Sequence, residues 1–425
     1  MSKSLNVNGE AWGRAVGQGQ TRYVGITGPM PIFQSTEGAT ETPVREAGVF
    51  NNLYIYVASN SANISSVITL RKSRADTSVT VTYTSGQTGV KQDTSNTATY
   101  ANTDEADYSI VLAAGSGDIN FRVLGIEFAP TDTTKTIQWA GWTGTGLSTA
   151  STTVYKSIGG SNTTTATEAD AKYRIRGTFT ASNFYATVSS NGRTTDTTVG
   201  MRKNGAAGNM SVIYTSGQTG AKEDTSNTDS LVAGDDYNLY YTTSTGGGTW
   251  QSSREYVQFS STANQFIFSV ARPAQAFGAA NTWYFPLCGD LSVPGNQEAN
   301  AQIYPEFEFT AKELETYVSA NSASFTSTFT IRDGGADSSV TISYTTGQTG
   351  LKTDSTNTAT IGVDQNISTK LATPAGSGSI TIGWVGSMGE TAGVAGAVTP
   401  ARTMRLFEGF SIKLISGRVI LHQKQ

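Results

Sequence analysis

Hydrophobic and polar residues alternate strictly along residues 78–84, SVTVTYT. Val79, Val81 and Tyr83 share one face of an extended chain there, and serine and threonine residues share the other. An alternation with a period of two predicts a half-buried β-strand. It returns twice along the chain, where the apolar face is formed by Met210, Val212 and Tyr214 and by Val340, Ile342 and Tyr344.

Other short segments follow the same period. Leu53, Ile55 and Val57 are expected to point inward from one strand. A further strand is expected at Ile68 and Leu70, with counterparts at Val199 and Met201 and at Phe329 and Ile331. Only residues 311–318, AKELETYV, also fit one or two helical turns. Short strands separated by turns rich in Gly, Ser, Asn and Asp predict an all-β chain of β-sandwiches, with Greek-key or jelly-roll connections.

The chain contains three tandem copies of one sequence repeat. The phrase YTSGQTGVKQDTSNT at Tyr83 returns at Tyr214 and Tyr344 in nearly the same letters, at offsets of 131 (214 − 83) and 130 (344 − 214). A period of this length is the size of a whole domain rather than of a solenoid repeat. The sequence therefore predicts three tandem β-sandwich repeats, 23–131, 132–262 and 263–425, after an N-terminal arm formed by residues 1–22.

The repeated phrase is interpreted mainly as a turn that crosses between two strands. Gly86 and Gly89 allow positive φ angles, and Asp93 and Asn96 favour Asx-turns. The alternative is that Asp93 and Asn96 coordinate Ca²⁺ or bind sugar hydroxyls, although Ca²⁺ requires more oxygen ligands than these loops offer. The candidate turn and interface residues of the other two copies are Tyr214, Lys222, Asp224, Asn227, Tyr344, Lys352, Asp354 and Asn357.

Two basic positions recur with the phrase. Lys91, like Lys222 and Lys352, precedes an aspartate by two residues, so we expect a weak local ion pair on a solvated face. Arg71, Arg202 and Arg332 end an alternating strand. A guanidinium suits bidentate pairing to a carboxylate, which predicts a structural role, possible also at an interface with a neighbouring domain.

Composition excludes several function classes. Only 15% of the 425 residues are charged and the net charge is −4 without a basic patch, so neither nucleic acid nor an anionic membrane is an expected partner. The single cysteine, Cys288, and the single histidine, His422, leave no disulfide framework, cysteine-based zinc cage or serine–histidine triad. Cys288 is expected to be a buried strand residue. We therefore expect no enzyme, no cofactor and no metal site.

Targeting signals are also absent from the sequence. The first residues, MSKSLNVNGEAWG, contain no apolar core of a signal peptide, and no apolar run is long enough for a transmembrane helix. The expectation is a protein made in a cytoplasm. A sugar-binding aromatic platform at Trp139 and Trp142 is disfavoured, because residues three apart point to opposite faces of a strand.

The C-terminal segment has no counterpart in the first two repeats. Phe410, Ile412 and Leu414 alternate, Ser416-Gly417 follow, and Val419 and Leu421 continue the pattern, which predicts a β-hairpin. It is either a closing strand pair of repeat 3 or an arm that adds to the sheet edge of a neighbour.

The stretch TLRKSRADTSVTVTYTSGQTGVKQDTSNT, residues 69–97, resembles jelly-roll modules in structural proteins of tailed bacteriophages. The shared features are a strand end of the LRK type, a Gly-Thr-Gly turn and a following Asp-Thr-Asn segment. The second and third copies depart from it, with MRKNGAAG and IRDGGADS.

The resemblance implies a non-enzymatic virion protein of tumour-necrosis-factor-like jelly rolls, which pack around threefold axes. Its expected partners are other virion proteins of the capsid or tail, in an oligomer or a pseudo-threefold assembly. Capsid decoration or reinforcement is the first hypothesis. A tail- or fibre-associated protein that binds host-surface glycans is the second, and a polysaccharide-acting enzyme is the third.

Overall fold

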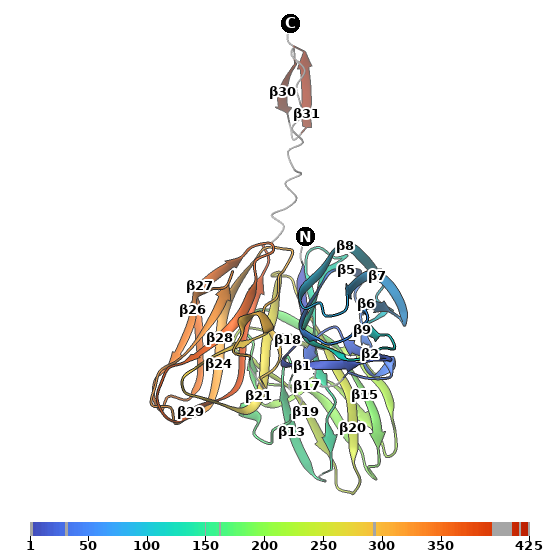
Figure 1. Cartoon of the computed structure of the whole chain (residues 1–425), viewed down its shortest axis with the longest axis vertical. Helices are drawn as coiled ribbons and strands as arrows, with labels where there is room; N and C mark the ends of the chain where they lie inside the picture. Colours follow the sequence, from blue (N-terminus) through green and yellow to red (C-terminus); the bar gives the residue numbers. More distant parts are fainter. Residues whose placement is uncertain are drawn as a thin grey trace. The chain divides into compact units, whose positions relative to one another are not determined.

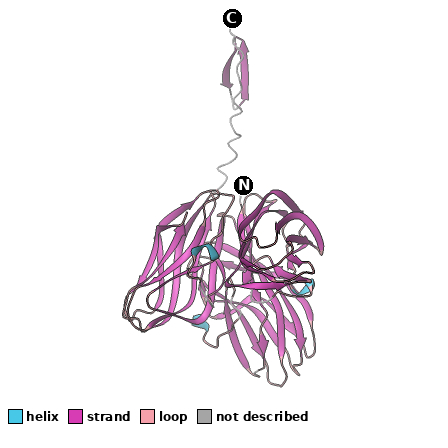
Figure 2. Ribbon diagram, in the orientation of Figure 1, coloured by secondary structure: helices cyan, strands magenta, loops and turns pink. Residues whose placement is uncertain are grey.

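The computed structural model describes residues 3–29, 33–148, 150–160, 163–291, 295–392, 410–415 and 418–423, with backbone only for 10–14 and for the last two ranges. The chain divides into two compact units, Met1–Gly393 and Val394–Gln425. Strands dominate both (Figure 2), and the helices of the described residues are short 3-10 turns: η1 (Glu37–Ala39), η2 (Glu168–Asp170) and η3 (Glu298–Asn300). None of these described helices has the length and hydropathy needed to cross a bilayer.

The first unit contains three jelly rolls, and the first of them runs to residue 130. Jelly roll 1 consists of β1 (Ser4–Gly17), β2 (Gln20–Gly25), β3 (Gly28–Pro29), β4 (Thr42–Pro43), β5 (Gly48–Asn60), β6 (Ser66–Lys72), β7 (Ala75–Tyr83), β8 (Gly89–Tyr100), β9 (Glu105–Leu112) and β10 (Asp118–Pro130). One sheet has the order β1-β10-β5-β8 and the other the order β2-β9-β6-β7. Strands thus alternate between the two sheets, except that β6 and β7 follow one another in the same sheet, which is the jelly-roll order.

The other two jelly rolls repeat this order. Jelly roll 2 consists of β11 (Thr136–Thr143), β12 (Gly146–Leu147), β13 (Thr152–Ser157), β14 (Tyr173–Arg174), β15 (Phe179–Asn191), β16 (Thr197–Lys203), β17 (Ala206–Tyr214), β18 (Gly220–Leu231), β19 (Asp236–Thr243) and β20 (Trp250–Ser261). Jelly roll 3 consists of β21 (Gln265–Gly278), β22 (Asn281–Phe285), β23 (Cys288–Asp290), β24 (Phe309–Asn321), β25 (Ser327–Asp333), β26 (Ala336–Tyr344), β27 (Gly350–Ile361), β28 (Ile367–Thr373) and β29 (Ser379–Glu390). Their sheets run β11-β20-β15-β18 with β13-β19-β16-β17, and β21-β29-β24-β27 with β22-β28-β25-β26 (Figure 1).

The alternation in the sequence sets which faces form the cores. In β7 the side chains of Val79, Val81 and Tyr83 are buried, whereas Thr80 and Thr82 are exposed. The equivalent residues of β17 and β26 are buried as well. The predicted all-β sandwich architecture is therefore confirmed, and the strand order makes it a jelly roll.

Two local expectations are wrong. Residues 4–17 of the expected N-terminal arm form β1, which pairs with β10 from Ser4↔Phe128 to Gly17↔Asp118. Leu5 and Val7 alternate with polar residues, but this alternation is short and ends at Gly9, so it did not stand out as a strand. Residues 311–318 form no helical turn but lie in β24, because Ala311, Leu314 and Val318 are drawn into a sandwich core.

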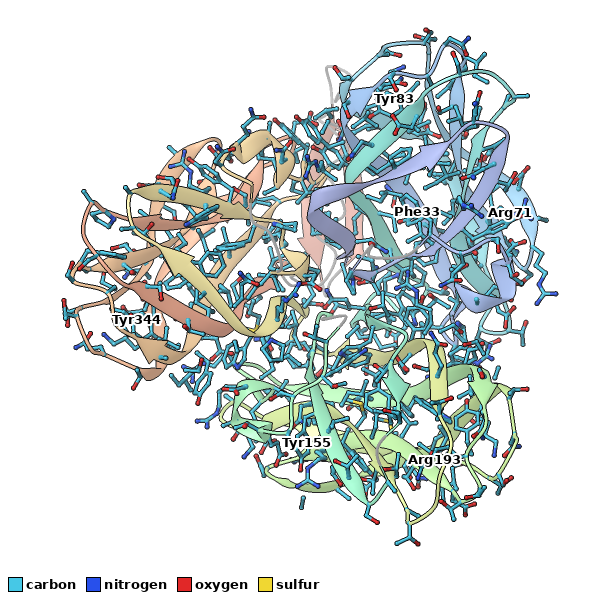
Figure 3. The ribbon with its side chains drawn as sticks, turned by 60° about the horizontal axis from the view of Figure 1, so that its bottom comes forward. Phe33, Arg71, Tyr83, Tyr155, Arg193 and Tyr344 are labelled. Carbon is cyan, nitrogen blue, oxygen red and sulfur yellow. The ribbon has the colours of Figure 1, made fainter. Side chains whose placement is uncertain are left out.

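The first strand of each jelly roll also packs into the core of a neighbour. Trp139 of β11 is buried with jelly roll 1, where its ring centroid lies 5.1 Å from that of Phe128. Ile267 of β21 is buried with the core of jelly roll 2, and Leu5 of β1 with that of jelly roll 3. The three exchanges run in one direction, so jelly rolls 1, 2 and 3 close into a ring (Figure 3).

Trp139 and Trp142 behave as their spacing predicts. Trp142 is buried in the core of jelly roll 2, and its Nε1 donates a hydrogen bond to the Ser157 carbonyl at 2.5 Å. Trp139 points the other way, into jelly roll 1. β11 thus lies between two cores, and neither indole belongs to a surface platform.

The buried side chain of Gln138 joins all three jelly rolls. Its Nε2 donates to the Leu5 carbonyl of β1 at 3.1 Å and lies 2.7 Å from the Ile267 carbonyl of β21. Its Oε1 accepts a hydrogen bond from the Ile267 amide at 2.7 Å. One amide side chain of jelly roll 2 therefore forms hydrogen bonds with backbone groups of β1 from jelly roll 1 and of β21 from jelly roll 3.

Backbone pairing closes the ring between the two ends of the first unit. β23 pairs in parallel with β21 over Cys288–Asp290 and with β1 at Glu10↔Asp290. The large sheets of jelly rolls 1 and 3 thereby form one continuous sheet. Cys288, expected in a buried strand, lies buried in β23, and burial raises the pKa of its thiol to about 11.

The predicted C-terminal hairpin is present. β30 (Phe410–Ile415) pairs with β31 (Arg418–Gln423) and places Ile412 opposite Leu421. The two strands form a sheet of their own among the described residues. The turn residues Ser416 and Gly417 lie outside the described residues.

Replacing Trp139 with alanine should destabilise jelly roll 1 rather than the repeat that contains Trp139 in the sequence. Losing a buried tryptophan costs about 3–5 kcal/mol, and the rings that lose contact are Phe50 and Phe128. Hydrogen exchange of the full chain should show faster exchange in β5 and β10. Alanine at the exposed Ile213 is the control; unchanged protection in β5 and β10 of the Trp139 variant would contradict the shared core.

Candidate functional site

The tyrosine that opens each repeated phrase fixes the turn after its strand. The buried Tyr83 hydroxyl lies 2.9 Å from the Ile55 carbonyl and 2.8 Å from the Gly89 carbonyl. Gly86 and Gly89 have φ angles of 70° and 88°, as the turn prediction requires. The same contacts join Tyr214 to Ala186 and Gly220, and Tyr344 to Thr316 and Gly350.

The second half of the phrase is a strand, not a loop. β8 begins at Gly89, and Asp93 and Asn96 lie at an irregularity opposite β5, between Asn51 and Leu53. Asp93 accepts hydrogen bonds from the Thr80 amide at 2.8 Å and from the Asn96 amide at 3.1 Å. Asp224 with Asn227 and Asp354 with Asn357 make the same contacts.

These contacts favour the structural interpretation of the Asp–Asn pair over a ligand site. Burial opposes ionisation of Asp93, but the hydrogen bonds from Thr80 and Asn96 outweigh it and lower the pKa of the carboxyl. Its oxygens are therefore already coordinated by protein donors. Among the described residues, no cluster of three or more His, Cys, Asp or Glu side chains is arranged to hold a metal ion.

The predicted Lys–Asp pair is wrong. The Lys91 ammonium donates to the Thr82 carbonyl at 2.5 Å and lies 5.3 Å from the centre of the Tyr83 ring. Lys222 and Lys352 make the same contacts with Ile213 and Tyr214 and with Ser343 and Tyr344. Each aspartate accepts hydrogen bonds from amide groups, and the lysine instead stabilises the tyrosine by a cation–π contact.

The repeated arginines pair with carboxylates, as expected, but inside their own jelly roll. Arg71 binds Glu37 of η1 through two hydrogen bonds of 2.9 and 3.1 Å. Arg202 with Glu168 of η2, and Arg332 with Glu298 of η3, repeat this bidentate pair. The arginines thus attach the 3-10 turn to the small sheet and are not seen to anchor a neighbouring domain. Figure 3 marks Arg71 and Tyr83 in jelly roll 1 and Tyr344 in jelly roll 3.

The contacts between jelly rolls involve residues that the sequence did not single out. Arg45 of jelly roll 1 forms an ion pair of 2.6 Å with Glu223 of jelly roll 2. Arg176, the equivalent residue 131 positions on (176 − 45), forms one of 2.9 Å with Glu313 of jelly roll 3. The next equivalent, 130 positions on (306 − 176), is Glu306, so the third interface carries a carboxylate where the first two carry a guanidinium.

The interface between jelly rolls 3 and 1 therefore gathers negative charge. The Glu306 amide donates to the buried Glu127 carboxylate at 2.6 Å, and Lys3 and Asn52 bind Glu127 at 2.9 Å each. Burial, together with the carboxylates of Asp364 and Glu127, raises the pKa of Glu306 to about 7. This contact is weakened when Glu306 ionises.

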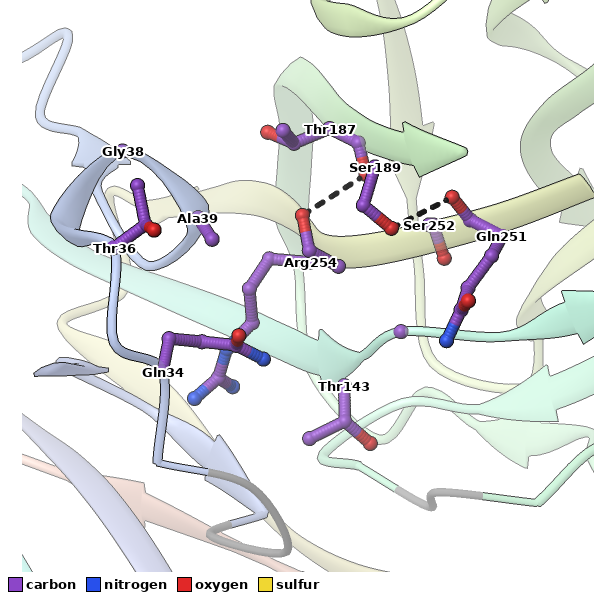
Figure 4. Close-up of a pocket in the computed structure, with 12 residues that line it drawn as sticks. Gln34, Thr36, Gly38, Ala39, Thr143, Thr187, Ser189, Gln251, Ser252 and Arg254 are labelled. Atoms are coloured by element: carbon purple, nitrogen blue, oxygen red, sulfur yellow. Dashed lines mark hydrogen bonds between the residues drawn. The ribbon is translucent and has the colours of Figure 1, made fainter. Parts of the chain in front are cut away.

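A cleft of about 500 Å³ lies between jelly rolls 1 and 2 (Figure 4). Gln34, Thr36 and Ala39 line it from jelly roll 1, and Thr187, Gln251 and Arg254 line it from β15 and β20 of jelly roll 2. No motif marks these residues in the sequence. They can be found only by aligning the three repeats, which shows the positions where the residues of jelly roll 2 differ from those of jelly rolls 1 and 3.

Comparisons with known proteins add little to this description. No family model matches the chain, and no curated protein matches it. Among solved structures, a chain described under "The Triple Jelly Roll Fold and Turret Assembly in an Archaeal Virus" is 13% identical, with a TM-score of 0.17, and the match covers 89% of this chain and 91% of that one. The jelly-roll assignment rests on this chain's own strand order.

Replacing Asp93 with alanine should destabilise the protein by about 1–3 kcal/mol, because the Thr80 and Asn96 amides lose the buried carboxylate that accepts their hydrogen bonds. The pKa of Asp93 lies below its ordinary value of 3.8, so its contribution is present above that value and is lost as the pH falls through the folded-state pKa. Denaturant unfolding of the full chain measures the loss. The exposed neighbour Thr94 replaced by alanine serves as the control, and a normal unfolding midpoint for Asp93→Ala would show that the carboxylate is dispensable.

Replacing Glu306 with glutamine should flatten the pH dependence of stability. The folded-state pKa of about 7 exceeds the ordinary value of 4.5. The folded protein therefore holds a proton that the unfolded chain has lost, and stability falls as the pH rises between these two values. Melting temperatures from pH 5 to pH 8 should decline less steeply in Glu306→Gln than in the wild type. The exposed Glu308→Gln variant should keep the wild-type slope, and an equally steep decline in both variants would refute the role of Glu306.

Proposed function

We propose that the protein is a non-enzymatic structural component of a tailed-bacteriophage virion that decorates or reinforces the capsid. The observation that carries this proposal is the closed ring of jelly rolls, in which the first strand of each packs into the core of another. One chain thereby presents similar surfaces three times around a common centre, as a symmetric trimer does. Such a unit fits the threefold positions of a capsid lattice.

The repeated surface is also suited to contacts in a particle. The exposed faces of β7 and β26 carry mainly small polar residues, whereas that of β17 also exposes alanines and Ile213. The turns after these strands are fixed by Tyr83, Tyr214 and Tyr344. Arg–Glu pairs hold each 3-10 turn in place. The resemblance of residues 69–97 to modules of phage structural proteins supports the same assignment.

The C-terminal hairpin is proposed to provide the contact with other virion proteins. A sheet of two strands is marginally stable alone in water, and β30 and β31 pair only with each other in the described part of the chain. Adding their free edges to a neighbouring sheet would stabilise both partners. This extends the arm hypothesis of the sequence.

Electron microscopy of intact particles tests the proposal. Particles carrying a labelled copy of the chain should show the label over capsid faces, at a copy number set by the threefold positions of the lattice. Particles without the protein should lose capsid stability on heating or dilution, while tail length and host adsorption stay unchanged. A label confined to the tail would overturn capsid decoration and favour the tail-associated alternative.

A further inference from the structure

The cleft between jelly rolls 1 and 2 exists because jelly roll 2 departs from its two relatives. Thr187 lies in β15 opposite Arg254, at the place where jelly rolls 1 and 3 have Tyr56 and Tyr317. Tyr56 packs against the core of jelly roll 3, and Tyr317 packs against the core of jelly roll 2. Two of the three interfaces are thus filled by a tyrosine, and at the remaining one the small Thr187 leaves the space open.

A second position enlarges the same space. Ser252 pairs with Val188 at the place where Phe121 and Ile382 occupy the other jelly rolls. Phe121 and Ile382 are completely buried in their cores. Ser252 instead lines the cleft. Jelly roll 2 therefore has small hydroxyl residues at two positions by the cleft where the other jelly rolls have larger side chains.

The third departure places a cation beside the cleft. Arg254 stands where jelly rolls 1 and 3 have Val123 and Trp384, and it is only 1% exposed. One guanidinium nitrogen lies 3.5 Å from the Pro29 carbonyl, and Nη2 has no hydrogen-bond partner among the residues that the structure describes. Figure 4 shows the side chain running from β20 toward the wall that carries Gln34.

The buried guanidinium of Arg254 lowers the stability of the folded protein unless an anion pairs with it. A buried guanidinium without a partner is strongly unfavourable, and none of the ion pairs found in the described ranges includes Arg254. The buried Glu255 carboxylate interacts mainly with Lys156 and also acts electrostatically on Arg254, but among the described residues no hydrogen bond or ion pair joins it to the guanidinium. Valine and tryptophan at the equivalent positions show that the fold does not need this charge. A ligand in the cleft would supply the hydrogen-bond partner that Nη2 lacks among the described residues.

The remaining lining defines what kind of anion fits. Gln34, Thr36, Ser189 and Gln251 supply amide and hydroxyl groups, which bind sugar hydroxyls, and no lysine or second arginine lines the cleft. A single guanidinium pairs well with one carboxylate, whereas a polyphosphate requires more positive charge. A volume of about 500 Å³ is in the range of small-molecule sites.

We propose that this cleft binds an acidic sugar of the uronic or sialic acid class, with the carboxylate on Arg254 and the hydroxyls on the Gln34 and Thr36 wall. The site is formed by two jelly rolls and depends on the ring being closed between them. This inference does not rest on the capsid role. A virion protein in either location could use it to attach to acidic polysaccharide.

Titration calorimetry of the full chain with glucuronic acid and N-acetylneuraminic acid, and with glucose as the neutral reference, tests the site. At least one acidic sugar should bind saturably, with glucose weaker by about tenfold or more, because a charged hydrogen bond is lost. Thr187→Tyr, which restores the tyrosine of the other jelly rolls, should abolish binding by filling the cleft. Arg254→Val should also abolish it while leaving thermal stability unchanged or higher.

Ser319→Ala is the matched control, because Ser319 is the counterpart of Ser189 in jelly roll 3, 130 positions on (319 − 189), and it should bind like the wild type. If Arg254→Val fails to fold, Arg254 has a structural role and the Thr187→Tyr variant alone decides whether the cleft is the site. Absence of saturable binding of both acidic sugars to the wild type would overturn the proposal. Equal binding by wild type and Thr187→Tyr, or equal binding of glucose, would overturn it as well.

Discussion

The structure of the first unit depends on the burial of each leading strand between two cores. β1, β11 and β21 belong by hydrogen bonding to their own jelly rolls, yet Leu5, Trp139 and Ile267 complete the cores of others. Because an apolar side chain stabilises the core in which it is buried, no jelly roll has a complete core without its neighbour. Gln138 adds polar specificity at the centre, since its amide satisfies backbone groups of β1 and β21 together.

This constraint explains why the three copies are similar in some places and different in others. The Tyr, Asp and Asn residues of the repeated phrase make contacts inside a single sandwich, and these contacts are the same in every copy. Residues at the interfaces meet a different neighbour in each copy. Arg45 and Arg176 form ion pairs with glutamates, whereas Glu306, at the equivalent position of jelly roll 3, lies beside Glu127. The equivalent positions of the three repeats thus carry opposite charges. The interface between the first and last jelly rolls gains backbone pairing through β23 instead.

The sequence predicted what is local and repeated. Alternation at Val79, Val81 and Tyr83, with its copies, identified the sandwich strands, and the turn glycines Gly86 and Gly89 were correctly placed. It failed at β1, where the alternation of Leu5 and Val7 with polar residues ends at Gly9, and at Lys91, whose ammonium contacts a carbonyl and an aromatic ring rather than Asp93. It could not find the partners of Arg71, because Glu37 is brought close only by the folded 3-10 turn. The interfaces between jelly rolls could not be predicted from the sequence, since contacts between repeats leave no periodic pattern of residues.

Departures among repeats are more informative than their identities once the fold is known. Thr187 and Arg254 replace side chains that fill the equivalent spaces elsewhere, and each replacement sacrifices packing that the fold would otherwise have. A cavity and a buried unpaired charge both lower stability, so their occurrence at one interface argues for a local use rather than for drift at scattered positions. The chain thus combines three copies of one scaffold with a proposed site that occurs at only one of the three interfaces. The ring that supports the proposed structural role is also what brings the two walls of that site together.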